Sequence, residues 1–221
     1  MSLCKKHFAR ISASLSQSDD GLRDNLDAYE MMLVQLHDDV LRIKSVKSTE
    51  GKNRIKAEIL PNYVAWCDGV IDQLTKTAGQ SARQDDVFAQ AFVWTVDVLD
   101  LPRVAEMFAA IQVANMRLPE RFKREPADFM LEQIAEAVIA GKHLPLAELQ
   151  RLENACAGID MHNEIRAKWC KAMGLLLESQ DDASSWQMAI DYFKQALQLN
   201  DKVGVKKRLN QLQSKLKKAA D

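Results

Sequence analysis

The sequence has few of the features that mark a secreted, membrane-bound or disulfide-rich protein. Its four cysteines, Cys4, Cys67, Cys156 and Cys170, are far apart and form no C-x-x-C pair, which argues against a zinc site and a disulfide framework. No run of 18 apolar residues occurs, and the first ten residues lack the apolar stretch of a signal peptide. Neither membrane insertion nor export is expected, so we predict a cytoplasmic protein with reduced, mostly buried thiols.

Signatures of nucleotide hydrolysis and of zinc-dependent catalysis are also missing. The pairs Gly51-Lys52 and Gly141-Lys142 have Val46 and Glu136 where a phosphate-binding loop needs its first glycine, so neither is a P-loop. The chain should not hydrolyse ATP. No H-E-x-x-H motif occurs, and each histidine is expected to be a surface or cap residue rather than a ligand or base. The four scattered histidines are His7, His37, His143 and His162.

Four Asp-Asp pairs, at 19–20, 38–39, 85–86 and 181–182, are the remaining candidates for a magnesium site. Three of them lie before or inside expected helix starts, where the helix dipole favours acids, so capping explains them better. A nuclease that uses two carboxylates and a lysine would carry its acids on strands, and the sequence predicts no strand. We therefore expect no catalytic residue, no metal ion and no cofactor in this chain.

Helical periodicity is what the sequence has instead. Apolar residues recur at steps of three and four along almost the whole chain, and no segment alternates with the two-residue period of a strand. The pattern predicts an all-α fold. The predicted helices are 2–15, 25–46, 51–74, 85–97, 102–115, 127–139, 146–157, 163–179, 184–199 and 202–218.

Three segments, 16–20, 75–84 and 117–126, have the polar, glycine or proline content of joints between helices. The second of these is the best candidate for a domain boundary, because a charged N-terminal part precedes it and a strongly apolar block follows. We predict three regions. They are an N-terminal helical region at 1–78, whose basic charges, described below, predict DNA binding, a central helical core and oligomerisation region at 85–158, and a C-terminal tetratricopeptide-like helical region for partner docking at 160–221.

Large apolar side chains gather between Val87 and Val113. So many of them in one helical pair can be buried inside one subunit or against a neighbouring one. We expect both, with internal packing and a contribution to an oligomer. The predicted interface residues are Phe88, Phe92, Trp94, Met107, Phe108 and Ile111.

The clearest charge pattern lies between Arg42 and Lys56, where six basic residues accompany one acid, Glu50, in a chain of net charge −1. It predicts two helices around a turn at 48–51, with a basic side that faces phosphate. A solvated face paired with the acidic run 19–39 is the alternative. The predicted DNA-binding residues are Lys5, Lys6, Arg10, Arg42, Lys44, Lys47, Lys52, Asn53, Arg54 and Lys56.

The C-terminal quarter carries a second pattern, in which Gly174, Ala189, Phe193 and Ala196 resemble the helix contact of a tetratricopeptide (TPR) hairpin. A single antiparallel helical pair closed by a third helix is the alternative. The segment 202–218 has seven basic residues and no acid, and we expect it to dock a partner. The predicted partner-binding residues are Lys206, Lys207, Arg208 and Lys215.

Several sequence blocks, read in order over about residues 5–217, resemble one protein family. They are Tyr29-Glu30-Met31-Met32-Leu33-Val34, Ile59-Leu60-Pro61, Val93-Trp94-x-x-Asp97, Leu118-Pro119 followed by Arg121, Lys123 and Arg124, Asn163-Glu164-x-Arg166, and Gly204-Val205-Lys206-Lys207. The set is similar to the small subunit of the terminases of temperate, contractile-tailed phages with cohesive DNA ends. That subunit is also named the terminase endonuclease subunit.

The resemblance implies a viral genome packaging protein that binds the cohesive-end site of concatemeric phage DNA and recruits a large ATPase subunit. Double-stranded phage DNA and that subunit are the implied partners, in a homo-oligomeric ring in the host bacterial cytoplasm, without a membrane. Whether the chain is itself an enzyme stays open, because the family name includes an endonuclease and the residues show no nuclease motif. A helical-repeat interaction scaffold without DNA binding is the alternative function.

Overall fold

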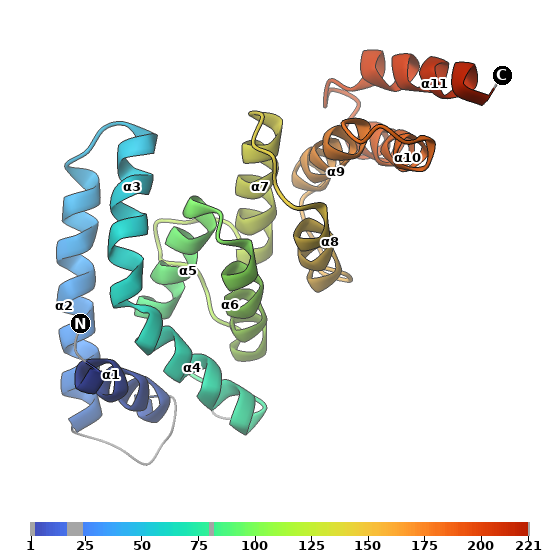
Figure 1. The fold of residues 1–221 in the computed structure, drawn as a ribbon. Helices are drawn as coiled ribbons and strands as arrows, with labels where there is room; N and C mark the ends of the chain where they lie inside the picture. The colour runs from blue at the N-terminus through green and yellow to red at the C-terminus, as the bar shows by residue number, and fades with distance from the viewer. Residues whose placement is uncertain (1–2, 17–23, 80–81, 221) are drawn as a thin grey trace. The chain divides into compact units, whose positions relative to one another are not determined.

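The protein is described by a computed structural model that covers residues 3–16, 24–79 and 82–220 (Figure 1). Its regular structure is helical throughout these ranges, with no strand, which confirms the all-α prediction. None of these helices is long and apolar enough to cross a membrane. The α-helices are α1 (Leu3–Ser16), α2 (Asp24–Lys44), α3 (Thr49–Ile59), α4 (Val64–Thr77), α5 (Asp86–Val98), α6 (Leu101–Ala114), α7 (Pro126–Ile139), α8 (Leu146–Ala155), α9 (Asn163–Glu178), α10 (Ala183–Leu199) and α11 (Lys206–Ala220).

The chain divides into two compact units, Met1–Pro126 and Ala127–Asp221. The division falls at the end of the third expected joint, 117–126, whereas the joint at 75–84 lies inside the first unit. The first unit holds α1 to α6, and the second holds nearly all of α7 together with α8 to α11. The sequence analysis defined its three regions by their expected functions, and this assignment of functions to regions stays a prediction.

Two predicted helices have different bounds in the structure. The helix expected over 51–74 is wrong, because a 3-10 turn at Leu60–Asn62 separates α3 from α4. Pro61 has no N–H to continue the α-helical hydrogen bonds, and its ring excludes the regular turn before it. The helix expected from 202 begins only at Lys206, since Gly204 has a φ of 82° in the preceding turn. Such a φ suits glycine and ends regular structure.

Two of the Asp-Asp pairs, 85–86 and 181–182, start helices as capping predicts, whereas 38–39 lies inside α2 and 19–20 lies outside the described residues. Asp85 accepts a hydrogen bond from the backbone N–H of Phe88 at 2.8 Å, and Asp182 accepts one from Ser185 at 2.8 Å. Each carboxylate satisfies an N–H that has no partner inside its own helix. These contacts fix where α5 and α10 begin.

Aromatic side chains fill the core of the first unit. Tyr63 lies edge-on to Trp94 with ring centroids 5.5 Å apart, and Phe92 stacks on Phe108 at 6.3 Å. All six residues predicted for the oligomer interface are at most 2% exposed, so packing inside the subunit accounts for them. Their part in an oligomer stays a prediction. The six are Phe88, Phe92, Trp94, Met107, Phe108 and Ile111.

Close helix contacts depend on glycine in both units. A Cβ atom at Gly69 in α4 would clash with the backbone carbonyl of Arg10, so this glycine lets α1 lie directly on α4. In the second unit Gly174 of α9 lies against the ring of Phe193 in α10. The α9–α10 pair therefore meets at the small and aromatic residues that the sequence pattern indicated.

Candidate nucleic-acid interface

The basic stretch of the sequence forms a helical hairpin in which α2 and α3 lie side by side (Figure 1). The turn spans residues 45–48, because α3 already begins at Thr49, where the Ser48 hydroxyl accepts a hydrogen bond from Gly51 N at 3.2 Å. Lys44 and Lys47 are exposed at this turn, and Lys52 follows in the first turn of α3. Among the residues that the structure describes, none forms an ion pair with these three lysines.

Three arginines of the predicted DNA-binding set are already paired with acids. Arg42 contacts Glu58 at 2.8 Å, Arg54 contacts Glu50 at 3.5 Å, and Nε of Arg10 donates to Asp72 at 2.8 Å. Exposed pairs of this kind contribute little to stability, so a phosphate can replace the carboxylate. Lys5 and Lys6 belong to α1, but their side chains lie outside the described part of the structure.

Asn53 and Lys56 hold α3 against α5. Nζ of Lys56 lies 2.7 Å from Oδ2 of Asp97, and the side chains are only 12% and 19% exposed. Asn53 donates to the backbone carbonyl of Asp97 at 3.1 Å and accepts from Lys56 at 3.1 Å. Burial raises the pKa of Asp97, and the lysine opposes that shift. Both side chains have a structural task, and a DNA contact by either stays a prediction.

This difference between neighbouring lysines leads to a first expected result. Lys56→Ala should lower the free energy of unfolding by about 2 kcal/mol, because it leaves the half-buried carboxylate of Asp97 without its cation. Lys52→Ala, one helical turn away, should change it by less than about 0.5 kcal/mol. Urea denaturation followed by tryptophan fluorescence measures both values, and equal stabilities would contradict the structural role of Lys56.

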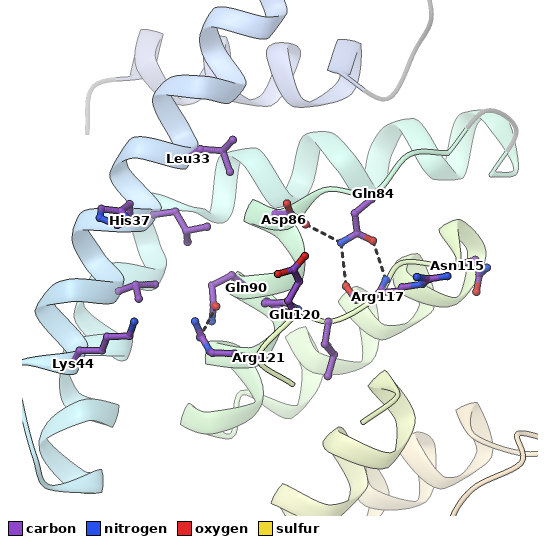
Figure 2. Close-up of a pocket in the computed structure, with 14 residues that line it drawn as sticks. Leu33, His37, Lys44, Gln84, Asp86, Gln90, Asn115, Arg117, Glu120 and Arg121 are labelled. Atoms are coloured by element: carbon purple, nitrogen blue, oxygen red, sulfur yellow. Dashed lines mark hydrogen bonds between the residues drawn. The ribbon is translucent and has the colours of Figure 1, made fainter. Parts of the chain in front are cut away.

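A groove of about 1070 Å³ opens between α2 and the segment that follows α6, and Figure 2 shows its lining. A smaller hollow of about 190 Å³ shares Lys44 and Arg121 with it and adds Lys52, Lys56 and Asp97. The helix α2 contributes Leu33, Leu36, His37, Val40 and Lys44 to the groove, and the rest of the lining is Gln84, Asp86, Gln90, Asn115, Arg117, Leu118, Pro119, Glu120 and Arg121.

Arg121 is the functional candidate that local sequence patterns did not place in this site. It lies 65 residues after the basic stretch ends, yet it lines the same hollow as Lys44 and Lys52. The sequence signal was the basic group Arg121, Lys123 and Arg124 after Leu118-Pro119. That group entered only through the family resemblance, because nothing in the sequence shows which helix it faces.

The predicted partner-binding residues lie on α11, which packs on α10 through Leu212. Arg208 pairs with Glu178 at 2.7 Å, while Nζ of Lys215 lies 3.7 Å from the centroid of the Trp186 ring. Lys206 and Lys207 are exposed and have no ion pair within the described part of the chain. The outer side of α11 is therefore a second basic surface.

The described residues include neither a cluster of metal ligands nor a cysteine with a lowered thiol pKa. No group of three or more His, Cys, Asp or Glu side chains suited to a metal ion occurs among the described residues. Cys67, Cys156 and Cys170 are free and buried. Burial raises the thiol pKa of all three, to about 12 for Cys156 and Cys170, so these cysteines stay protonated and unreactive near neutral pH.

Comparisons with known proteins agree with the ordered blocks of the sequence. The sequence model of the family described as phage small terminase subunit matches residues 33–164. The terminase endonuclease subunit of Escherichia phage P2 is 30% identical over 218 residues, which cover 96% of this chain and 85% of the relative. The probable terminase endonuclease subunit of Haemophilus phage HP1 is 24% identical over 212 residues, which cover 89% and 73%. No solved structure matches the chain.

The family match spans more than half of the chain, and the alignment with the phage P2 protein spans nearly all of it. The family match extends from α2, which carries the start of the basic face, beyond Arg121 and into α9. The resemblance read from the sequence blocks is thereby confirmed, and this chain belongs to the family of phage small terminase subunits.

Proposed function

We propose that this chain binds double-stranded phage DNA at the cohesive-end site through the α2–α3 basic face and delivers it to the large ATPase subunit of the terminase. The observation that carries the proposal is the group of three lysines, Lys44, Lys47 and Lys52, that no acid among the described residues neutralises. In a chain of net charge −1, such a local excess is available to phosphates.

Phosphate contacts at this face supply affinity and orientation, whereas sequence choice needs contacts to base edges. Arg54 points outward with 78% of its side chain exposed and suits a guanine edge. Asn53 is occupied by Asp97, so few groups remain for direct readout. Recognition then depends on DNA shape and on several subunits that bind together, as a homo-oligomeric ring in the host cytoplasm would allow.

The second unit is proposed to dock the large subunit through the basic outer side of α11, where Lys206 and Lys207 have no ion pair with any residue that the structure describes. The α9–α10 pair has the small-residue and aromatic contact of a TPR hairpin, and a TPR-like role in this docking is part of the proposal. The relatives are named terminase endonuclease subunits. We assign the cut itself to the assembled terminase, in which this subunit selects the DNA.

The DNA-binding proposal is tested with the double variant Lys47→Glu and Arg54→Glu, whose side chains are both exposed. Affinity for a duplex from the phage end region should fall about 10- to 100-fold, and the slope of log K against log salt should lose about two units. Fluorescence anisotropy in a sodium chloride series, against an unrelated duplex, measures both.

The matched control is Lys206→Glu with Lys207→Glu on α11, which should bind DNA as the unchanged protein does. If only this control loses affinity, the DNA site belongs to α11 and not to the α2–α3 face. If the unchanged protein binds no duplex even at low salt, the DNA-binding proposal is wrong, and the result favours the alternative function of an interaction scaffold.

A further inference from the structure

Arg121 is a cation without a carboxylate partner in the part of the chain that the structure describes. Its guanidinium donates a hydrogen bond to Oε1 of Gln90 and lies over the ring of Phe122, 4.9 Å from the centroid. Burial lowers the pKa of Arg121, and the charge of Asp97 offsets this only in part. A guanidinium in such surroundings gains more from an incoming anion than a fully hydrated one does.

Gln90 adds an unsatisfied donor beside this guanidinium. The residue is 2% exposed, and its Nε2 has no hydrogen-bond partner. Because a guanidinium only donates hydrogen bonds, the side-chain atom that contacts Arg121 is the oxygen, and the free end is therefore the N–H donor. A buried donor without a partner costs about 1 to 3 kcal/mol. An acceptor that enters the groove would remove this cost.

Charges converge on the place where the groove and the smaller hollow share Lys44 and Arg121. Figure 2 shows these two side chains reaching toward one another, with Gln90 next to Arg121. Lys52 joins them from α3, while Lys56 neutralises Asp97. Three positive charges from three separate segments thus meet at a hollow in which the acid among the lining residues, Asp97, is already paired with Lys56.

Acidic side chains also line the larger groove. Asp86 and Glu120 line that groove but not the smaller hollow. Their carboxylates repel an anion, so the smaller hollow, which neither of them lines, is the part that attracts one. The charges therefore define a bounded site and not a diffuse basic surface.

We propose that Lys44, Lys52 and Arg121 form a binding site for a phosphate group, and that Gln90 positions the guanidinium and offers its free N–H to a phosphate oxygen. The phosphate is a backbone or terminal phosphate of the bound duplex, which extends the DNA interface from the α2–α3 hairpin onto the segment after α6. This inference rests on the proposed function and adds residues to its site.

The test uses the full chain and the variants Arg121→Gln and Gln90→Glu. Glutamate at position 90 places a carboxylate beside Arg121, so it competes with phosphate and should leave the fold at least as stable. Inorganic phosphate, titrated against chloride at constant ionic strength, should raise the melting temperature of the unchanged protein and have no such effect on either variant. Each variant should bind duplex DNA about tenfold more weakly, with about one unit less salt slope.

Lys123→Gln is the matched control, because it removes an exposed cation from the same segment, and it should keep the phosphate effect. Normal DNA binding by both variants, with no phosphate effect on the unchanged protein, overturns the site and leaves the proposed function intact. A phosphate effect that both variants lose, in a chain that binds no DNA, keeps the site for free phosphate and overturns the DNA function.

A third outcome concerns the class of occupant. If phosphate has no effect and both variants lose binding to the large subunit but not to DNA, the groove takes an acidic protein segment, and the phosphate assignment is wrong. A phosphate effect lost together with DNA affinity, while Lys123→Gln behaves as the unchanged protein, supports the DNA phosphate.

Discussion

Replacing Gly174 by leucine is expected to unfold the second unit, because α9 and α10 touch at this position. A Cβ atom there would lie 2.6 Å from Cδ1 of Phe193, whose ring is completely buried. Inserted methylenes in a packed core cost about 1 to 3 kcal/mol, and leucine adds a whole side chain. We expect a loss of roughly 4 kcal/mol or more in the free energy of unfolding of this unit.

Urea denaturation followed by tryptophan fluorescence measures this loss, since Trp169 and Trp186 are both buried in the second unit. The free energy of unfolding of Gly174→Ala should lie between the values of the unchanged protein and of Gly174→Leu. Ala147→Leu places the same leucine at an exposed position of α8 and should unfold as the unchanged protein does. A Gly174→Leu protein with an unaltered midpoint would show that the two helices can separate at this contact without loss.

The contact between α9 and α10 could be predicted from the sequence, because the residues that form it lie in two consecutive helices. Gly174 and Phe193 stand at helical spacing within two neighbouring helices, and the small-residue pattern alone indicated that they meet. The helix starts at Asp85 and Asp182 could also be predicted, since a capping side chain bonds to a backbone N–H only a few residues away. The break at Pro61 was missed because apolar periodicity continues through it into α4.

Contacts between segments that are far apart in the sequence could not be predicted from it. The sequence showed Lys56 as one more base in a basic run, but its partner Asp97 lies 41 residues away. Arg121 and Gln90 are 31 residues apart, and no pattern in the residues around either one indicates that the two side chains meet. Sequence reasoning found the charge of the α2–α3 face, and the structure was needed to separate structural bases from unpaired ones.

The apolar block around Phe88 and Phe108 shows a second limit. A core and a subunit interface both require large apolar side chains, so composition does not separate them. Burial inside the first unit shows that these rings belong to its core, and their part in a subunit interface stays a prediction. Exposed apolar side chains on α2, such as Met31 at 72% and Val34 at 64%, carry no pattern in the sequence that distinguishes them from core residues.

Removal of the Asp85 carboxylate is expected to be the most damaging single change in the first unit. This side chain is 1% exposed, caps α5 through Phe88 N, and accepts a hydrogen bond from the indole N–H of Trp66 at 2.9 Å. Loss of an N-cap costs about 1 kcal/mol, and a buried indole N–H without a partner costs about 1 to 3 kcal/mol. Asp85→Ala should therefore lower the free energy of unfolding by about 3 kcal/mol at pH 7.

The same variant has a pH signature that an ordinary loss of packing lacks. Burial raises the pKa of Asp85 from 3.8 to about 6, against the opposing effect of its two hydrogen bonds. The folded state thus binds a proton more readily than the unfolded state between these values. Titration of Asp85 alone should therefore add about 3 kcal/mol of stability as the pH falls from 7 to 4, for a shift of about two units.

Alanine at position 85 cannot titrate, so the stability difference between the two proteins should widen toward pH 4. Urea denaturation of both proteins at a series of pH values from 4 to 7.5 measures this difference directly, because all other carboxylates titrate in both. A difference that narrows as the pH falls would mean that the hydrogen bonds from Phe88 and Trp66 outweigh burial and hold the carboxylate ionised. Asp85 would then stabilise the start of α5 as an anion, and its dominant task would be electrostatic.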